Sequence, residues 1–92
     1  MDASVVIASY NRQELLAACL RCLDAQDYPR DRFEVIVVDD GSTDGSAEMV
    51  RNWSARYSLR CIAAGHQGPG PAPNFGVAHA LGALIIFIDD DA

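Results

Sequence analysis

Four short runs of mostly apolar, often β-branched residues recur along the chain, and a polar segment follows each of them. The runs occupy residues 4–9, 34–38, 59–63 and 84–88. Apolar runs of this length are typical of strands that are buried on both faces of a parallel sheet. The pattern therefore predicts four strands of one sheet.

The segments between these strands show the spacing of amphipathic helices. Helices are predicted for residues 13–25, 46–57 and 74–81, and the first has the clearest apolar stripe. This β-α-β-α-β-α-β alternation indicates an α/β fold, a Rossmann-like, mostly parallel sheet with helices on both faces. We predict the strand order 3-2-1-4, because the acids that follow strands two and four must then converge at one crevice.

Polar residues that precede the helices predict how each helix begins. Asn11 is predicted to be the N-cap of the first helix, with Glu14 as its capping-box partner. Ser42 or Thr43 is predicted to cap the second helix, and Gly82 is predicted to close the third.

Composition narrows the class of protein. Half of the 92 residues are hydrophobic, which is enough for a core. The net charge is −6 and the seven basic residues are all scattered arginines, so no nucleic-acid partner is expected. No run reaches the roughly 20 apolar residues of a membrane-spanning helix, and the start of the chain does not resemble a signal peptide. With an odd number of cysteines, a reduced, cytoplasmic location is expected.

Acidic residues follow two of the predicted strands, and a polar residue follows a third. In a parallel sheet the carboxyl ends of all strands lie at one edge, where ligands bind in open α/β folds. Carboxylates crowded together repel one another, and a cation or hydrogen-bond donors of a ligand would relieve this. The alternative is a solvated acidic rim of ordinary turn residues. The residues in question are Asn11, Asp39, Asp40, Asp89, Asp90 and Asp91.

The last acid cluster contains the spacing Asp-x-Asp at Asp89 and Asp91. Hard carboxylate oxygens favour Mg²⁺ or Mn²⁺ over zinc. Because two side chains cannot complete an octahedral shell, water and phosphate oxygens must supply the remaining ligands. This spacing therefore suits a substrate that carries a diphosphate.

Three other motifs do not support a site. The glycine-rich loop at residues 65–70 matches neither the dinucleotide-binding fingerprint nor a Walker loop, since its third glycine is replaced by Pro73 and the chain has no lysine. Cys19 and Cys22 lie on the apolar side of a predicted helix, where small core residues are a better interpretation than metal ligands. The histidines at 66 and 79 have no partner that the sequence identifies.

Four motifs, in this order, resemble those of a known family. They lie at residues 5–12, 37–46, 70–76 and 86–91. Together they resemble the amino-terminal half of a family 2 glycosyltransferase of GT-A fold, over essentially the whole chain. The resemblance implies a nucleotide-sugar donor, usually a UDP-sugar, and a divalent cation, Mn²⁺ or Mg²⁺. It also implies transfer of the sugar to an acceptor with inversion at the anomeric centre.

The resemblance implies roles for single residues. Ala8 and Tyr10 match positions that line the pocket for the base. Asp40 matches the carboxylate that hydrogen-bonds the base, and Asp39 helps to form the same pocket. Asp91 matches the acid that ligates the metal. The implied donor-binding residues are Ala8, Tyr10, Asn11, Asp39, Asp40, Asn74, Gly76, Asp89 and Asp90, and the implied metal ligands are Asp89 and Asp91.

The resemblance assigns no catalytic residue to this chain, because in the family the catalytic base and the acceptor site follow Asp-x-Asp. We therefore expect residues 1–92 to be the nucleotide-sugar-binding half of a GT-A domain, truncated after this motif and inactive alone. Two positions depart from the family pattern. Pro73 stands where arginine is usual and Ala83 where glutamate is common, and both concern the donor loop.

Two alternatives from other classes remain open. One is a non-catalytic binding or scaffold module of the same fold. The other is a receiver module of signalling proteins, which also groups carboxylates around Mg²⁺ but requires a lysine that this chain lacks. The apolar run at 84–88 predicts an uncovered edge strand through which the fragment self-associates. Any membrane association would involve other parts of the parent protein.

Overall fold

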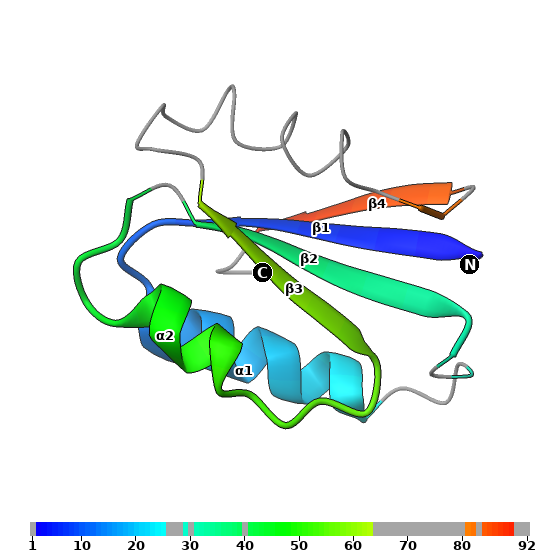
Figure 1. Ribbon diagram of the computed structural model, residues 1–92, viewed down its shortest axis with the longest axis horizontal. Coiled ribbons are helices and arrows are strands. Elements are labelled where there is room, and N and C mark those ends of the chain that lie inside the picture. The colour runs from blue at the N-terminus through cyan, green and yellow to red at the C-terminus, as the bar shows by residue number, and fades with distance from the viewer. Residues whose placement is uncertain are drawn as a thin grey trace.

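A computed structural model of the chain describes residues 2–25, 29, 31–39, 41–63, 81–82 and 84–89. Its centre is a four-stranded sheet in the order β3-β2-β1-β4, in which every pair of neighbours is parallel (Figure 1). The predicted strands and their order are confirmed. The strands are β1 (Ala3–Ser9), β2 (Phe33–Asp39), β3 (Ser58–Ala63) and β4 (Leu84–Asp89).

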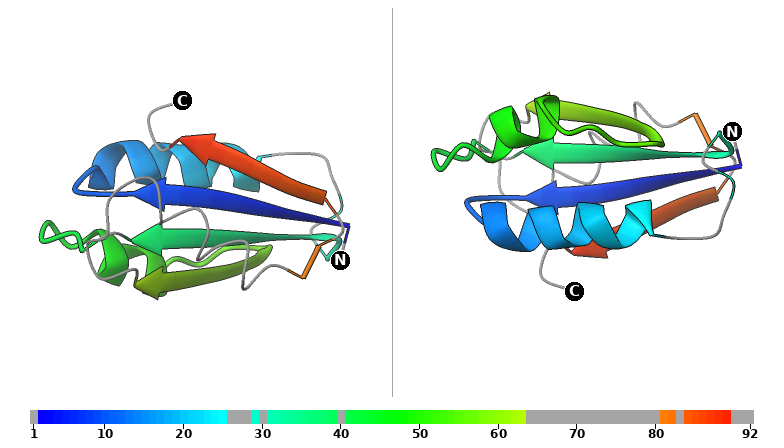
Figure 2. Two further views of the ribbon diagram at one scale, coloured as in Figure 1. Left: turned by 90° about the horizontal axis from the view of Figure 1, so that it is seen from above. Right: turned by 90° about the horizontal axis from the view of Figure 1, so that it is seen from below.

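The two described helices, α1 (Gln13–Asp24) and α2 (Ser46–Arg51), cover the same face of the sheet (Figure 2). The connection from β1 to β2 and the connection from β2 to β3 both run towards the same edge of the sheet. Right-handed crossovers that run in the same direction place their helices on the same face of the sheet. The third predicted helix, at 74–81, lies outside the described residues except for Leu81, which is not helical.

The second helix is shorter than its apolar spacing predicts, because a tertiary contact competes with its last turn. It ends at Arg51 instead of continuing to residue 57. Tyr57 is buried, its ring lies 5.3 Å from that of Phe33, and its hydroxyl donates to the Leu20 carbonyl oxygen over 3.0 Å. Burial, followed by the charge of Asp24, raises the pKa of Tyr57 to about 12, so this hydroxyl stays a donor.

The hydrophobic core has two parts, one on each side of the sheet. All seven residues of β2 are buried, which explains its unbroken apolar run. Between the sheet and the helices, Leu16, Leu20 and Val50 pack against Val5 and Val35. The opposite face has a smaller cluster, formed by Val6, Ile36 and Val38.

Strand β4 is an edge strand with one described neighbour, β1. Leu84 is 59% exposed and Phe87 is 56% exposed, and a groove of about 370 Å³ lies between β4, Phe33 and Leu23. The predicted uncovered apolar edge is therefore present among the described residues, while self-association stays a prediction. Neither described helix is long and apolar enough to cross a membrane.

Candidate functional site at the carboxyl edge of the sheet

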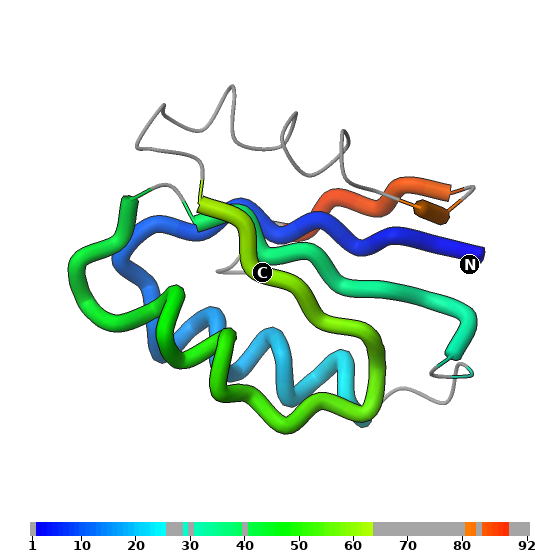
Figure 3. Tube along the Cα trace, in the orientation of Figure 1, coloured from blue at the N-terminus to red at the C-terminus, as the bar shows by residue number. Residues whose placement is uncertain are grey.

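The carboxyl ends of three strands meet at one level of the sheet. Ser9 pairs with Asp39 across β1 and β2, and Ala8 pairs with Asp89 across β1 and β4. From β1 the chain proceeds to β2 on one side, whereas β4 lies on the other side. Such a reversal of strand order marks the crevice in which open α/β sheets bind ligands. The tube in Figure 3 shows the connections after β1 and β2 leaving the sheet at this edge.

Five of the predicted site residues are described. Ala8 is half-buried near the end of β1, and Tyr10 and Asn11 follow the strand in exposed positions. Asp39 is the buried last residue of β2, and the backbone of Asp89 ends β4. The structure therefore brings these residues to one edge. The other predicted site residues, Asp40, Asn74, Gly76, Asp90 and Asp91, lie outside the described residues.

Asn11 joins the loop after β1 to the loop after β2. Its N–H donates to Ser42 Oγ over 2.8 Å, and its side-chain oxygen Oδ1 accepts from the Thr43 N–H over 2.7 Å. It has a left-handed backbone conformation, with φ of 51°, which asparagine tolerates better than most residues. We call these contacts of Asn11, Ser42 and Thr43 the loop clamp.

The loop clamp corrects the predicted helix caps. The N-cap of α1 is Arg12, which makes no side-chain capping hydrogen bond. The amide oxygen of Asn11, the predicted cap, accepts from the Thr43 N–H instead. Ser42 and Thr43 do not cap α2 either. The N-cap of α2 is Gly45, with φ of 91°. Local spacing predicted these caps, whereas partners about 30 residues away in the sequence determine the contacts.

Asp44 extends the link between the two loops, and the sequence reasoning did not single it out. Its carboxylate accepts from the Gln13 N–H over 3.2 Å and from the Ser46 N–H over 3.0 Å, and also from the Ser46 hydroxyl. The Ser46 hydroxyl is the largest influence on the pKa of Asp44, which is lowered because these hydrogen bonds outweigh partial desolvation. An Asp two residues before a Ser at a helix start is a pattern that could have indicated this contact.

Removing the amide of Asn11 is expected to loosen the loop clamp. Asn11→Gly keeps a residue that tolerates the left-handed backbone but loses the acceptor for Thr43, so stability should fall by about 1 kcal/mol. The Thr43 amide should exchange its hydrogen faster, as NMR would measure. Asn11→Asp, which keeps the acceptor oxygen, is the control and should protect that amide. Equal protection in the Gly variant and the parent would contradict the role of the clamp.

Asp39, the last residue of β2, contacts the loop that follows this strand. One of its oxygens, Oδ2, accepts from the Ser42 N–H over 3.2 Å. The other, Oδ1, is buried without a hydrogen-bond partner among the described residues, and the same holds for the neighbouring Ser9 Oγ. Burial and the charge of Asp39 raise the pKa of the half-buried Cys61 thiol on β3.

The other two cysteines behave differently from each other. Cys19 packs against the core, as predicted for a small core residue, whereas Cys22 is exposed because the apolar stripe of α1 turns away from it. None of the three cysteines forms a disulfide.

The described part of the chain contains no group of three His, Cys, Asp or Glu residues that could hold a metal ion. Of the two predicted ligands, Asp89 is the last residue of β4 and its backbone is in register with Ala8 at the edge described above, whereas Asp91 lies outside the described residues. Both predicted ligands are aspartates, and carboxylate oxygens are the donor type that Mg²⁺ and Mn²⁺ prefer. The chemistry of this donor set therefore fits a divalent cation.

Comparisons with known proteins identify one protein family. Residues 4–92 match the family model of glycosyl transferase family 2. Glycosyltransferase AglE of Haloferax volcanii is 39% identical over 90 residues, which are 96% of this chain and 30% of that protein. The chain thus spans less than a third of the length of this relative.

Two solved structures resemble the fold closely. Staphylococcus aureus TarS 1–349 in complex with UDP-GlcNAc matches with a TM-score of 0.91 and 33% identity, over 99% of this chain and 27% of that one. The mannosyltransferase PcManGT from Pyrobaculum calidifontis, in complex with GDP-Man and Mn²⁺, matches with a TM-score of 0.92 and 35% identity, over 98% of this chain and 27% of that one.

Proposed function

Because this chain belongs to glycosyl transferase family 2, we propose that it forms the donor-binding part of a glycosyltransferase, in which it holds a nucleotide-diphosphate sugar together with Mn²⁺ or Mg²⁺. The observation that carries this proposal is the meeting of β1, β2 and β4 at one carboxyl edge, where Asp39 and Asp89 pair with the end of β1. The two similar structures that contain nucleotide sugars support it.

The proposed donor is a UDP-sugar. A carboxylate at Asp40 can accept from the N–H of uracil, and Tyr10, exposed at the end of β1, has a ring that can stack on a base. Ala8 leaves room beside it because its side chain is small. The similar structures hold UDP-GlcNAc in one case and GDP-Man in the other.

Asp89 and Asp91 are the residues that we propose to hold the cation. A divalent cation supplies neutralisation of the charge on a diphosphate leaving group. Asp90 lies between them in the sequence, and Asn74 and Gly76 belong to the donor loop that the family resemblance implies. We assign no catalytic residue in this chain. Transfer of the sugar to an acceptor, with inversion, is proposed for the parent enzyme.

Calorimetry with UDP, in the presence and absence of Mn²⁺, tests the proposal through the division of roles between the two acid clusters. Asp40→Ala should remove a charge-assisted hydrogen bond and weaken UDP binding by about 1.5–3 kcal/mol, with or without metal. Asp91→Ala should weaken binding mainly when Mn²⁺ is present, because it removes a metal ligand.

Asp31→Ala provides the matched control, since Asp31 is an exposed acid that precedes β2 at the opposite end of the sheet. It should leave UDP affinity unchanged. If Asp91→Ala left the effect of Mn²⁺ intact, the metal assignment would be wrong. If neither substitution mattered, the solvated acidic rim would be the better explanation.

The two alternative functions differ in how this structure bears on them. A receiver module places its first strand between its second and third strands, whereas here β1 lies between β2 and β4. The strand order therefore argues against that class. A binding or scaffold module of the same fold would show neither UDP binding nor an effect of Mn²⁺ in the same calorimetric experiment.

A further inference from the structure

A carboxylate is buried in the sheet, far from the candidate site. Glu34 is the second residue of β2, near the amino end of the strand, and its side chain is 1% exposed. Charged side chains are almost never buried to this degree unless they are paired. The donor-binding function proposed above does not use this residue.

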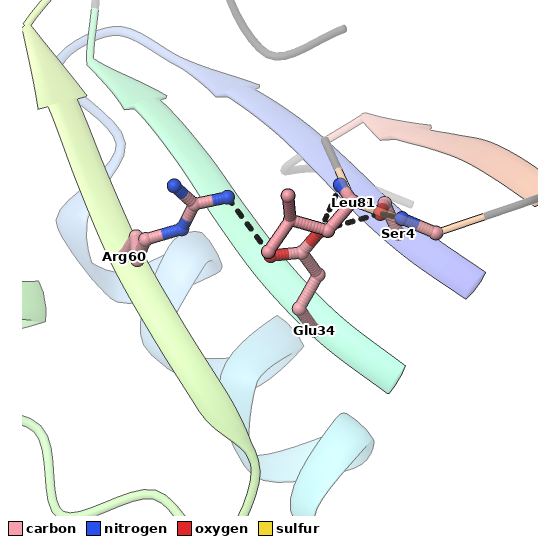
Figure 4. A network of polar contacts seen from close by, with 5 residues as sticks. Ser4, Glu34, Arg60 and Leu81 are labelled. Atoms are coloured by element: carbon pink, nitrogen blue, oxygen red, sulfur yellow. Dashed lines mark hydrogen bonds and ion pairs between the residues drawn. The ribbon is translucent and has the colours of Figure 1, made fainter. Parts of the chain in front are cut away.

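The partners of Glu34 come from both sides of β2. Its Oε2 accepts from Ser4 Oγ over 2.6 Å and from the Leu81 N–H over 2.6 Å, and its Oε1 accepts from Arg60 Nη2 over 2.8 Å (Figure 4). Ser4 Oγ in turn accepts from the Gly82 N–H over 2.8 Å. One carboxylate thus joins β1 and β3 to residues 81–82, which precede β4.

The charge on this carboxylate is well compensated. Burial alone would raise the pKa of Glu34, but the hydrogen bonds from Ser4, Leu81 and Arg60, together with the positive charge of Arg60, hold it below its ordinary value of 4.5. Glu34 is therefore ionised at neutral pH. Arg60 is the charged group that faces it among the described residues.

The segment before β4 fits against β1 too closely to shift. A Cβ atom on Gly82 would lie 2.5 Å from the carbonyl carbon of Ala3 and 2.6 Å from the nitrogen of Ser4. Just beyond, the Leu84 N–H donates to the Asp2 carbonyl oxygen over 3.1 Å. The start of β4 is thus held by Glu34, by Ser4 and by the backbone of Asp2.

Strand β4 is an edge strand whose Leu84 and Phe87 are exposed, and of its described side chains only the partly buried Ile85 and Ile88 pack against the two core clusters. A slip of one residue would exchange its two faces, and a slip of two would move its far end by roughly 6.6 Å. Such a slip would separate Asp89 from Ala8, its partner at the carboxyl edge. The placement of the acids at 89–91 therefore depends on what fixes the start of the strand.

We propose that Glu34 is a positioning residue for the acid-bearing strand: by accepting the Leu81 N–H across β1, it sets the register of β4 and so places the acids at its other end. The part of this inference that concerns ligand binding rests on the donor-binding function proposed above. The part that concerns the strand does not.

Hydrogen exchange by NMR on the 92-residue chain tests the strand directly. Glu34→Leu fills the same space but leaves the Leu81 N–H without its acceptor. Glu34→Leu removes one partner of a buried ion pair, so global stability should also fall, and the exchange of the β4 amides is therefore compared with that of the β2 amides in the same variant. The amides of β4 should exchange about tenfold faster or more, relative to those of β2. Glu34→Gln, which keeps one acceptor oxygen, should restore part of this protection.

Asp2→Asn is the matched control, because Asp2 pairs with Arg32 over 2.8 Å at the same end of the sheet but its side chain is 39% exposed. It should leave the ratio of β4 to β2 exchange unchanged. Cross-strand NOEs between β1 and β4 should match the pairing of Ala3 with Leu84 in the parent chain. The proposal would be overturned if the ratio of β4 to β2 exchange were the same in Glu34→Leu as in the parent chain, even if both strands exchanged faster.

The pH dependence gives a second readout, in the parent chain itself. Because the pKa of Glu34 is lowered in the folded state, its contribution is complete above 4.5 and is lost as the pH falls through the folded value. The ratio of β4 to β2 exchange should therefore rise in that window in the parent chain and stay flat in Glu34→Gln. A flat ratio in the parent chain would contradict the proposal.

Titration with UDP and Mn²⁺ separates the two parts of the inference. If the parent chain binds UDP, Glu34→Leu should weaken the Mn²⁺-dependent binding by about tenfold. If the parent chain does not bind UDP, the donor-binding proposal fails while the exchange measurements still decide the role of Glu34. Unchanged affinity in a variant whose β4 exchanges fast would show that Glu34 does not place the acids.

Discussion

Replacing Gly82 with alanine is expected to detach the start of β4 and to lower the free energy of unfolding by about 3 kcal/mol, the upper end of the range for overpacking. The added Cβ would lie 2.5 Å from the Ala3 carbonyl carbon, 2.6 Å from the Ser4 nitrogen and 2.7 Å from Ser4 Oγ. Two of these atoms belong to the backbone of β1, which is fixed between β2 and β4. No flexible side chain can therefore move aside to relieve this strain. Urea denaturation would measure the change.

A second glycine distinguishes close approach from backbone strain. Gly45 has φ of 91°, but a Cβ there would meet only the Gln13 side chain, at 3.8 Å and beyond. Gly45→Ala should cost about 1–2 kcal/mol for its left-handed conformation, and Gly45→Asn should cost less, because asparagine tolerates that conformation. At position 82, asparagine should be no better than alanine. A recovery with asparagine at position 82 would show that conformation, rather than space, requires glycine there.

Truncating Leu20 is expected to have an effect of similar or larger size. Leu20 is 0% exposed in the cluster between α1 and the sheet, and Leu20→Ala should lower stability by about 2–5 kcal/mol. A small domain has a total stability of only about 5–15 kcal/mol, so this variant should be close to unfolding at 37 °C. Thermal and urea denaturation would both register the change.

Leu15→Ala is the matched control, with the same substitution on the same helix. Leu15 is 47% exposed, and its truncation should change stability by no more than about 0.5 kcal/mol. The urea midpoint should shift in the Leu20 variant with the same slope as in the parent chain. Equal shifts in both variants would mean that α1 does not pack on the sheet through the stripe that contains Leu20.

The sheet could be predicted from the sequence because its information is local. Every residue of β2 is buried. A strand that is buried on both faces is rich in apolar residues, so the local run of residues was enough to indicate a central strand. The acids at the strand ends indicated the order of the strands, because residues that bind one ligand must meet at one edge. The observed order β3-β2-β1-β4 agrees with that reasoning.

The helix caps and the end of α2 could not be predicted in the same way. Asn11 has the right residue type for an N-cap, but Thr43, 32 residues away, is its partner. The apolar spacing continues past Arg51, but the burial of Tyr57 against Phe33 competes with further helix. In both cases a contact distant in sequence outweighed a local preference.

The buried carboxylate of Glu34 could not be predicted from local sequence either. Nothing in the composition distinguishes Glu34 from the other acids of the chain, and its partners Arg60 and Leu81 lie 26 and 47 residues away. For the candidate site, the structure places Ala8, Asn11, Asp39 and the backbone of Asp89 at the predicted edge. Their roles towards a donor depend on a ligand and stay proposals.

The central place of β1 in the sheet has a consequence for the order in which the protein folds. Ser4 contacts Glu34 across 30 residues of chain, but it contacts Gly82 across 78. Closing the longer loop loses roughly 0.8 kcal/mol more in chain entropy, and contacts distant in sequence slow folding. During synthesis, β1, α1 and β2 can assemble while β4 is still inside the ribosome. The acidic edge is thus completed last, on a scaffold that has already formed.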